Sequence, residues 1–479
     1  MSKTSPGVLA PPHEVLTPEE WLRRGRDQRK LASRRSHAQW EAPPDRPDPI
    51  AVLEGQARTR VPDLVPIRYG RMAASPFAYF RGAAAPMAWD LAHTPTAGIR
   101  VQACGDAHLL NFGMFAAPDR QLVFDVNDFD ETLPAPFEWD IKRLAASFAI
   151  AARDKELHDR DAHAAARLAT RSYRTEMSNY AAMRFLDVWY ARIDIAEVSS
   201  LFDALQPKAA ARRRHKDIAK ARRRTSLTAF LKMCDQVEGQ YRIRPAHPVI
   251  VRYPIERHPG VLRELRHAIG QYLETLRADQ REVLRRYYFG DFARKVVGVG
   301  SVGTEAFVVL LLGDRPDEPL FLQLKEAQES VLAPFAGKSE FSHQGERVVS
   351  GQRLTQAAAD PFLGWTSGIA TSSRAANRAI AGPKDYYVRQ LRDMKGSMSV
   401  QLMDAHQLNY YGRLCGWALA RAHARTGRAA EITGYLGSSE DFDHAIADFA
   451  MAYADQNEQD YGRLLQAISA ARIQATVGQ

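Results

Sequence analysis

Helical and strand-like patterns alternate along the chain and predict a mixed fold. Five stretches have the composition of helices, and Gly290 closes the second of them. They cover residues 141–235, 261–289, 344–358, 400–425 and 440–475. Short apolar runs at Val296-Val297, Ala306–Leu312, Leu320–Leu324 and residues 386–391 predict strands. This mixture indicates an α+β protein with a small antiparallel sheet and a larger, mainly helical part.

Two N-terminal regions depart from this pattern. Residues 1–45 are polar, and Thr17-Pro18-Glu19-Glu20 predicts the start of a basic helix, with a capping Thr, Pro in the first turn and acids near the positive helix end. Residues 64–140 are dense in Gly, Pro, Phe, Asp and Arg, with short apolar runs. Long helices do not have such a composition, whereas loops that carry function do.

The composition is that of a globular protein. Of 479 residues, 45% are apolar and 25% charged, and the formal net charge is +9. The longest clear apolar run, Ala306–Leu312, falls well short of the roughly 20 residues that span a bilayer, and the first residues lack the apolar core of a secretory signal. Three cysteines without CxxC spacing argue against a structural zinc site. These features predict a cytoplasmic protein without a membrane span.

The positive charge favours anionic partners, and its densest stretch is Lys208–Arg224. A helix there would carry Lys and Arg on all sides, which suits nucleic acid or an acidic surface. The stretch has no interleaved aromatic residues for base stacking, and a solvated helix with salt-bridged neighbours explains the same charges. Nucleic acid is therefore an alternative partner that the sequence does not favour.

A glycine-rich segment precedes a lysine on a predicted strand. Gly298, Gly300 and Gly303, with Ser301 between them, form a GxGxxG pattern. In a dinucleotide fold a helix would follow, but here an apolar, β-branched run follows, so we expect a strand, a loop and a second strand. Glycines at a hairpin tip allow backbone N–H groups to approach phosphates, and Lys325 on the next strand could reach them too. The alternative is a plain β-meander with a surface lysine.

Acidic residues gather in residues 104–140. Asp106 is followed five residues later by Asn111, and an apolar strand then leads to Asp125, Asp128 and Asp130. Carboxylates beside apolar strands are costly unless they meet cations or donors. Magnesium takes a few oxygen ligands and completes its shell with water and substrate phosphates. Such a cluster could supply a base and two metal ligands, or it could be an Asx-rich turn system that only caps strands.

The residues Gly105-Asp106, Asn111 and Asp128-Phe129 resemble the Brenner motif of aminoglycoside phosphotransferases and other kinase-like enzymes. The resemblance implies that Asp106 is the base and that Asn111 and Asp128 hold Mg²⁺. Asp125 competes with Asp128 for the metal, and Asp130 is a third alternative. Asp140 resembles the later Asp that braces the catalytic loop. Cys104-Gly105 stands where these enzymes usually have His or Arg.

The order of these motifs is reversed relative to an ordinary kinase, because the catalytic loop precedes the glycine loop. A circular permutation reconciles the two orders, and Leu408–Arg425 is similar to the helix ahead of the catalytic loop. The resemblance implies a two-lobed, circularly permuted kinase-like fold. Its expected units are an N-terminal extension (1–45), a helical part with the catalytic and metal loops (46–290), a nucleotide-binding β-rich lobe (291–395) and C-terminal helices that complete the helical lobe (396–479).

In kinases the strand lysine pairs with a helix Glu, and Glu346 is the candidate for Lys325, with Glu329 and Glu340 as alternatives. Arg81, with Arg71, either binds phosphate or pairs with the acidic cluster.

The chain also resembles the bacterial DUF2252 family. The matching stretches are Arg68–Met72, Ser75–Gly82, Cys104–Gly113, Asn127–Glu131 and Asp360–Trp365. This second resemblance also implies a kinase-like grouping.

The resulting expectation is an ATP- and Mg²⁺-dependent phosphotransferase that acts on an unidentified hydroxyl acceptor. A nucleic-acid-binding or scaffolding protein, a silent nucleotide-binding pseudokinase and a nucleotidyl transferase remain as alternatives. The enzyme hypothesis requires that Lys325 lie near the carboxylates around Asp106 and Asp128.

Overall fold

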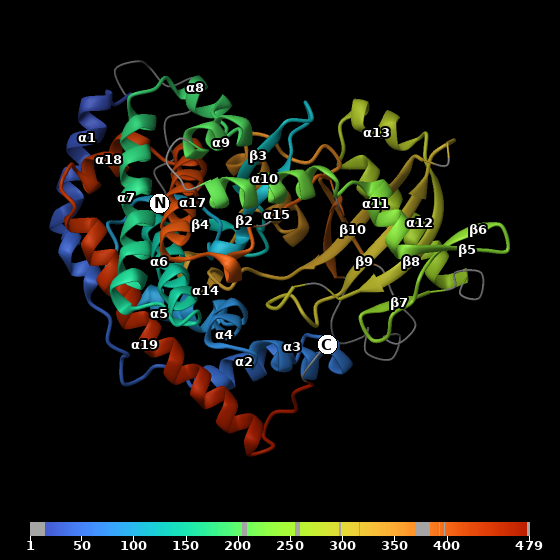
Figure 1. The fold of residues 1–479 in the computed structure, drawn as a ribbon, viewed down its shortest axis with the longest axis horizontal. Coiled ribbons are helices and arrows are strands. Elements are labelled where there is room, and N and C mark those ends of the chain that lie inside the picture. Colours follow the sequence, from blue (N-terminus) through green and yellow to red (C-terminus); the bar gives the residue numbers. More distant parts are fainter. Residues whose placement is uncertain are drawn as a thin grey trace.

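A helical part and a sheet part lie side by side in the protein (Figure 1). The computed structural model describes residues 15–203, 208–253, 259–296, 298–315, 317–368, 384–391, 393–396 and 398–476. The mixed α+β class, with small antiparallel sheets and a larger helical part, is confirmed. Among the described residues, no helix has both the length and the apolar character that crossing a membrane requires.

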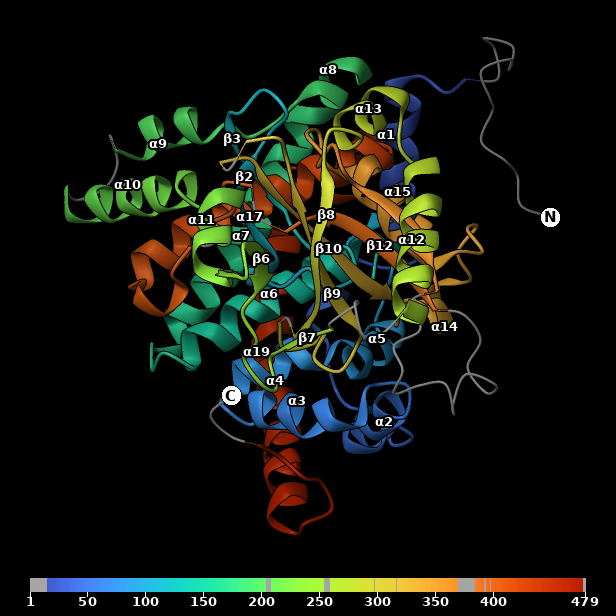
Figure 2. The ribbon, with the colours of Figure 1, turned by 90° about the vertical axis from the view of Figure 1, so that its right-hand side faces the viewer.

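The sheet part is built on six antiparallel strands in the order β11-β12-β10-β9-β8-β7. These strands are β7 (Ile250–Arg252), β8 (Tyr288–Lys295), β9 (Ala306–Leu312), β10 (Pro319–Ala327), β11 (Gly364–Ser367) and β12 (Asp385–Gln390). Helix α12 (Pro259–Glu274) packs along one face, and α11 (Ser226–Met233) covers the other (Figure 2).

Alternating side chains of β9 explain why both faces are covered. Phe307 and Val309 pack with Leu265 of α12, whereas Val308 and Leu310 pack with Phe230 of α11. Successive side chains of a strand point to opposite faces, so a continuous apolar run requires a partner on each side.

The predicted strands and helices of this part are shifted in places. β9 has the predicted bounds and β10 is longer, but the strand expected at Val296-Val297 ends at Lys295, and Val297 lies outside the described residues. The single helix expected over 261–289 is divided into α12 and α13 (Ala278–Leu284). Gly290 lies within β8 instead of closing a helix, because the preceding aromatic residues pack against the sheet core. The expected boundary between 290 and 291 therefore falls inside β8.

Four long helices form the centre of the helical part: α6 (Phe137–Arg153), α7 (Asp159–Ala181), α17 (Ala405–Thr426) and α19 (Asp441–Ser469). Glycines let α17 approach α7 closely, since a Cβ at Gly416 would lie 2.1 Å from the carbonyl oxygen of Ala169. The predicted helices over 400–425 and 440–475 correspond to α17 and α19 with shorter bounds.

The N-terminal extension packs onto this helical part. α1 (Pro18–Asp27) begins as predicted, with Thr17 and Glu20 forming a capping box. It lies against α18 (Ala429–Leu436), where a Cβ at Gly434 would come within 2.1 Å of the carbonyl oxygen of Leu22. Residues 15–45 are therefore an integral layer of the fold.

Residues 46–136 form short elements, and for the part from residue 64 onward this agrees with the prediction from composition. They are α2 (Pro49–Ala57), α3 (Val65–Met72), α4 (Pro76–Gly82), α5 (Ala84–Ala92) and the strands β1 (Arg100–Ala103), β2 (Phe112–Ala116), β3 (Leu122–Val126) and β4 (Leu133–Pro136). β1 pairs with β4 and β2 with β3. The loops between these strands carry the acidic residues.

The remaining elements lie between these units or at their edges. They are α8 (Phe185–Tyr190), α9 (Ile195–Asp203), α10 (Lys208–Arg222), β5 (Cys234–Val237), β6 (Gln240–Ile243), α14 (Ala333–Ala336) and α15 (Gln344–Thr355). The basic stretch forms α10, which projects from the body beside α9 (Figure 2).

Candidate active site

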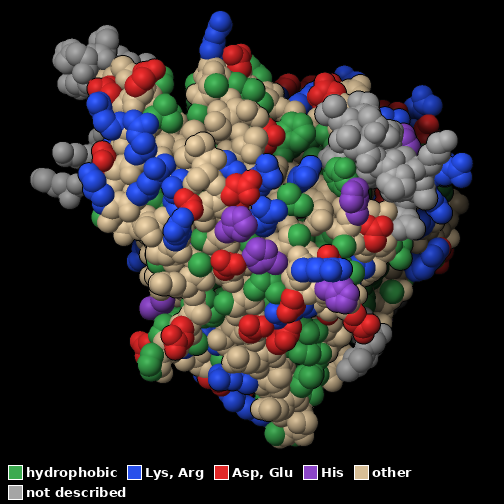
Figure 3. Space-filling model, turned by 60° about the vertical axis from the view of Figure 1, so that its left-hand side comes forward, with side chains coloured by type: hydrophobic (Ala, Val, Ile, Leu, Met, Phe, Trp, Pro, Cys, Tyr) green, Lys and Arg blue, Asp and Glu red, His purple; other side chains and the backbone are tan. Residues whose placement is uncertain are grey.

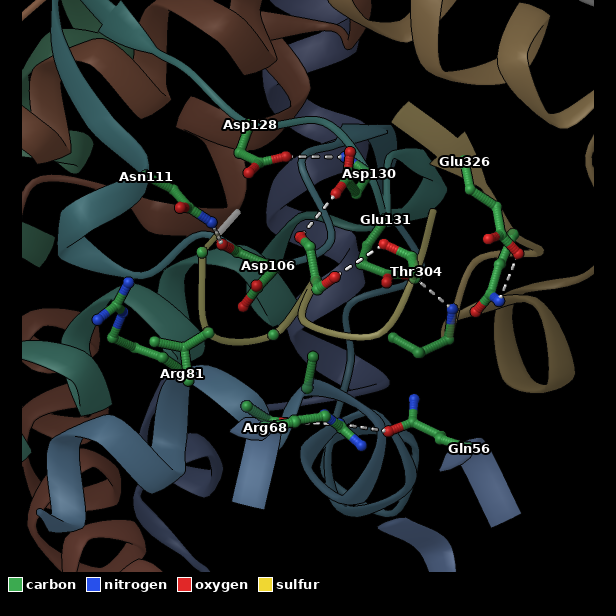
Figure 4. A pocket seen from close by; sticks show the side chains of 18 of the residues that line it. Gln56, Arg68, Arg81, Asp106, Asn111, Asp128, Asp130, Glu131, Thr304 and Glu326 are labelled. Atoms are coloured by element: carbon green, nitrogen blue, oxygen red, sulfur yellow. Dashed lines mark hydrogen bonds between the residues drawn. The ribbon is translucent and has the colours of Figure 1, made fainter. Parts of the chain in front are cut away.

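A pocket lies where the helical part meets the tip of the β8–β9 hairpin (Figure 4). Its walls come from four regions of the chain. These are α3, α4 and the residues before them, the loop between β1 and β2, the loop between β3 and β4, and the glycine loop with the segment after β10. The pocket therefore combines segments that are far apart in sequence.

The glycine-rich segment is the tip of an antiparallel hairpin between β8 and β9, so the strand–loop–strand expectation is confirmed and a dinucleotide-type strand–helix unit is excluded. Gly298 and Gly303 have φ angles of +69° and +92°, which L side chains rarely adopt. At Gly300 a Cβ would lie 3.0 Å from the carbonyl oxygen of Arg81. Glycine is needed here for backbone conformation and for close approach to α4.

Contacts from the helical part hold the glycine loop in place. The Nη1 atom of Arg71 donates to the carbonyl oxygen of Gly298 at 2.6 Å. Arg60 donates to the carbonyl oxygen of Val302 at 2.5 Å, and the Val61 amide donates to Gly303 at 2.8 Å. The loop is thus fixed along most of its length.

Asp106 faces the pocket with one oxygen held from behind. The Nε atom of Arg143 donates to Oδ1 at 2.5 Å, and the side chain of Arg143 is almost fully buried. The hydrogen bonds between described residues reach only Oδ1, and His108 lies 3.9 Å from Oδ2. Burial lowers the pKa of His108 to about 3, so this ring is neutral at pH 7. Oδ2 is the atom of Asp106 that can meet a ligand.

Asn111 and Asp128 also line the pocket, and both lie above Asp106 in the view of Figure 4. The Asn111 side-chain amide donates to the carbonyl oxygen of Asp106 at 2.8 Å, which leaves its own oxygen for another partner. Burial alone would raise the pKa of Asp128, but Lys325 and Arg389 outweigh it and lower that pKa. Asp128 is therefore a carboxylate anion at neutral pH.

Lys325 reaches the acidic cluster through Asp130. Its Nζ lies 2.6 Å from Oδ2 of Asp130 and 3.9 Å from Asp128, although Lys325 and Asp130 are 195 positions apart. The same Asp130 accepts from the Tyr387 hydroxyl at 2.6 Å and from the Ser301 hydroxyl of the glycine loop at 3.3 Å. Burial opposes the charge on Lys325, yet the two carboxylates raise its pKa above the ordinary value.

Asp140 braces the loop that carries Asp106. Its carboxylate accepts from the amides of Cys104 at 2.6 Å and Gly105 at 3.0 Å, and lies 3.1 Å from Nε2 of His423 on α17. Gly105 has a φ of +82°, and a Cβ there would lie 2.2 Å from the carbonyl oxygen of Glu131. This buried network explains the Cys104-Gly105 pair, since the turn leaves no room for a larger residue at 105.

Two of the predicted site residues are not brought to this cluster. Asp125 points away into the helical core, where both of its oxygens accept from Arg421 at 2.7 Å, so it does not face Asn111. Glu346 on α15 does not contact Lys325. The same helix instead sends Arg347 to the carbonyl oxygens of Asp130 and Thr132. Of the alternatives, Glu329 lines the pocket and Glu340 does not.

Several residues of the site were not singled out from the sequence. Arg143 follows Asp140 by one helical turn, and this spacing was the only local signal for it. Tyr387, Arg60 and Arg347 come from distant elements and carry no such signal. Burial raises the pKa of Glu131, another lining residue, to about 7, and this too depends on the assembled fold.

The family of the chain follows from a comparison with known families. The model of DUF2252, described as "Uncharacterized protein conserved in bacteria", matches residues 60–467. The chain belongs to the DUF2252 family. No curated protein and no solved structure matches the chain.

The DUF2252 match includes most of the candidate site. It begins at Arg60 and so contains every pocket residue except Gln56. It also contains His423 of α17, which supports the Asp106 loop through Asp140.

Proposed function

We propose that the protein is a kinase-like, circularly permuted phosphotransferase that uses ATP and Mg²⁺ and acts on an acceptor hydroxyl. The observation that carries this proposal is the meeting of Asp106, the glycine loop and the Lys325–Asp130 pair around one pocket. Phosphoryl transfer relies mainly on positioning and charge neutralisation, and such a pocket offers both.

The order of elements within the sheet part supports the proposal. β8, β9 and β10 follow one another in the chain and pair as antiparallel neighbours, after the short strand β7 at the outer edge of β8. The glycine loop joins β8 and β9, and Lys325 lies on β10, the third strand of this consecutive set. Protein kinases have a glycine-rich loop followed by a lysine on their third strand. A helix, α15, follows here as well, although its glutamate does not pair with the lysine.

Asp106 would orient the acceptor. Its free Oδ2 would accept a hydrogen bond from the acceptor hydroxyl and take the proton as the hydroxyl oxygen bonds to the terminal phosphorus of ATP, while the bond from that phosphorus to the bridging oxygen breaks and ADP leaves. Arg143 fixes the orientation of the carboxylate from the buried side. Lys325 would supply positive charge near the transferred group, in exchange for part of its contact with Asp130.

The residues present fit a magnesium ion with few protein ligands. No group of three or more His, Cys, Asp or Glu side chains suited to a metal occurs among the described residues. Magnesium bound with a nucleotide commonly needs only one or two protein oxygens, and the Asn111 amide oxygen and the Asp128 carboxylate would provide them. When bound, the ion would neutralise charge on the phosphates.

The decisive test is Asp106→Asn, measured by ADP production and by calorimetric binding of Mg·ATP. We expect loss of transfer with binding retained, because the substitution removes the proton acceptor and leaves the phosphate contacts. Asp279→Asn, at an exposed helix start outside the pocket, is the matched control and should behave as wild type. Normal transfer by Asp106→Asn would refute the assigned role.

The contact of Arg143 with Asp106 also favours a second candidate, a catalytically silent nucleotide-binding protein. A guanidinium 2.5 Å from Oδ1 already occupies one of the two carboxylate oxygens, so Asp106 can serve to hold the loop in place without accepting a proton. In that case the wild type binds Mg·ATP but yields no ADP with any hydroxyl acceptor. A nucleic-acid-binding protein, in contrast, would show steeply salt-dependent binding through α10 and no Mg·ATP affinity.

A further inference from the structure

Three arginines from the helical part line the same pocket as Asp106. Arg60 precedes α3, Arg68 lies on α3 and Arg81 lies on α4. Arg68 is 1% exposed and Arg60 is 7% exposed. A guanidinium at such depth is normally paired with a carboxylate.

None of these three arginines has a carboxylate within salt-bridge distance among the described residues. Arg68 donates through Nη2 to Gln56 and to the carbonyl oxygen of Gly82, each at 3.0 Å, while its Nε and Nη1 have no partner. The Nε atoms of Arg60 and Arg81 also have none. Buried donors therefore remain without a partner on three residues that line a pocket with acids on its other side.

Some other buried arginines of this chain are paired with carboxylates, whereas Arg347 and Arg425 donate only to backbone or amide oxygens among the described residues. Arg46 binds Asp90 and Asp460, and Arg421 binds Asp125. In the pocket, by contrast, burial lowers the pKa of Arg68 to about 9 and lowers the pKa values of Arg60 and Arg81 as well. Asp106 counteracts this lowering at Arg81, and Glu131 and Glu326 counteract it at Arg60, but none of these carboxylates pairs with the arginines directly. An anionic ligand would offset the remaining cost of burying the charge.

The position of these arginines separates them from the proposed nucleotide site. Figure 4 shows Arg68 and Gln56 on the opposite side of the glycine loop from Asp128 and Asp130, with Asp106 between the two groups. If the nucleotide phosphates lie near Lys325 and Asp128, an acceptor whose hydroxyl meets Asp106 extends toward Arg81 and Arg68.

We infer that Arg60, Arg68 and Arg81 form a subsite for a phosphate group of the acceptor, so that the substrate is a phosphorylated compound with a free hydroxyl. This inference rests on the proposed function. Three guanidiniums from separate elements suit the three terminal oxygens of a phosphate monoester better than the two oxygens of a carboxylate.

Inorganic phosphate is the probe for this subsite, measured by calorimetry without Mg²⁺ or nucleotide at constant ionic strength. We expect the wild type to bind it, and Arg81→Gln and Arg68→Met each to weaken binding about tenfold or more, because charge-assisted hydrogen bonds are lost. Arg285→Gln, which removes an exposed arginine, should bind as wild type. Gln56→Leu, which removes the partner of Arg68 without removing a charge, provides a further folded variant if Arg68→Met fails to fold.

A second arm assigns the phosphate to the acceptor or to the nucleotide. Phosphate binding is repeated with saturating Mg²⁺ and a non-hydrolysable ATP analogue, and we expect it to persist. Competition between inorganic phosphate and the ATP analogue would show that the arginines hold nucleotide phosphates and would overturn the inference. Acetate binding as strongly as phosphate would overturn the choice of a phosphate group, and so would unchanged phosphate affinity in Arg81→Gln.

The two proposals fail separately in these experiments. If Lys325→Ala loses Mg·ATP binding but still binds phosphate, the substitution has affected the nucleotide site and not the arginine subsite. Absence of phosphate binding in a wild type that binds Mg·ATP refutes the acceptor subsite and leaves the phosphotransferase proposal standing.

Discussion

Asp130 is the residue at which three segments of the pocket meet. It contacts Lys325 of β10, Tyr387 of β12 and Ser301 of the glycine loop. A carboxylate with three such partners holds its neighbours in position, and it occupies the lysine that would otherwise face a nucleotide. Nucleotide binding would therefore require Lys325 to give up part of its contact with Asp130 and to contact a phosphate instead.

Lys325→Ala should abolish the thermal stabilisation by Mg·ATP. It should also lower the free energy of unfolding by about 2 kcal/mol, because Asp128 and Asp130 lose their buried cation while remaining partly open to water. Differential scanning fluorimetry and urea unfolding measure the two effects. The exposed Lys232→Ala on α11 is the control and should keep the Mg·ATP shift; an equal shift in Lys325→Ala would contradict the nucleotide site.

His37 predicts a dependence of stability on pH outside the pocket. It is fully buried beside Tyr435, and burial lowers its pKa to about 3 from 6.5. Between these values only the unfolded chain takes up the proton, so stability is lost as the pH falls below 6.5. The free energy of unfolding should therefore fall less between pH 7 and pH 5 in His37→Phe than in the wild type, by about 2 kcal/mol. Urea unfolding at both pH values tests this, and parallel losses in both proteins would contradict it.

At the scale of elements, the short loops between strands carry the site and the strands around them fix its geometry. The turn at 104–105 follows β1, is held by Asp140 at the start of α6, and is supported through His423 by α17. An element far along the chain thus determines the position of Asp106.

Gly105→Ala should destabilise the protein by at least about 2 kcal/mol and also reduce activity. The added Cβ would meet the carbonyl oxygen of Glu131 at 2.2 Å in a backbone conformation with positive φ. Gly55→Ala is the matched control, because no heavy atom lies within 4 Å of its Cβ, and in helix α2 it should gain about 0.5 kcal/mol. Urea unfolding compares the two, and equal stabilities would refute the argument.

Element patterns were predictable where they were local. The bounds of β9 follow from an uninterrupted apolar run that ends at Gly313, and the start of α1 follows from its capping residues. The end of α13 at Leu284, short of Gly290, was missed because the sheet recruits the aromatic residues before Gly290. The partner of Lys325 was also missed: Asp130 was considered only as a metal ligand, since its approach to β10 depends on Tyr387 and Ser301.

At the scale of the whole molecule, the pocket depends on the contact between the helical part and the sheet part. The arginines and Asp106 belong to the first, and the glycine loop and Lys325 to the second. The expected proximity of residues near 106 and 325 rested on a family resemblance, because the hydrophobic, glycine and acidic patterns of the sequence do not by themselves require it. The face drawn in Figure 3 intersperses acidic and basic side chains over most of its area, so the net positive charge does not dominate that face.

Arg71→Ala should loosen the contact between the two parts without unfolding either. It removes a 2.6 Å hydrogen bond to Gly298, worth about 1 kcal/mol, so amide exchange in residues 298–304 should become about fivefold faster. Hydrogen exchange with mass spectrometry measures this. Arg277→Ala removes an exposed arginine paired with Asp279 and should leave the exchange rate of the loop unchanged. An unchanged rate in Arg71→Ala would show that the loop is held only by its own hairpin and would contradict the prediction.

The scattering of pocket segments along the chain has a consequence for biosynthesis. The wall is completed only by Val331, and the brace behind Asp106 only by His423. A polypeptide emerging from the ribosome exposes its acidic loop long before the opposite wall exists. Translation products that stop before residue 331 therefore lack the assembled cavity, and those that stop before residue 423 lack the brace behind Asp106.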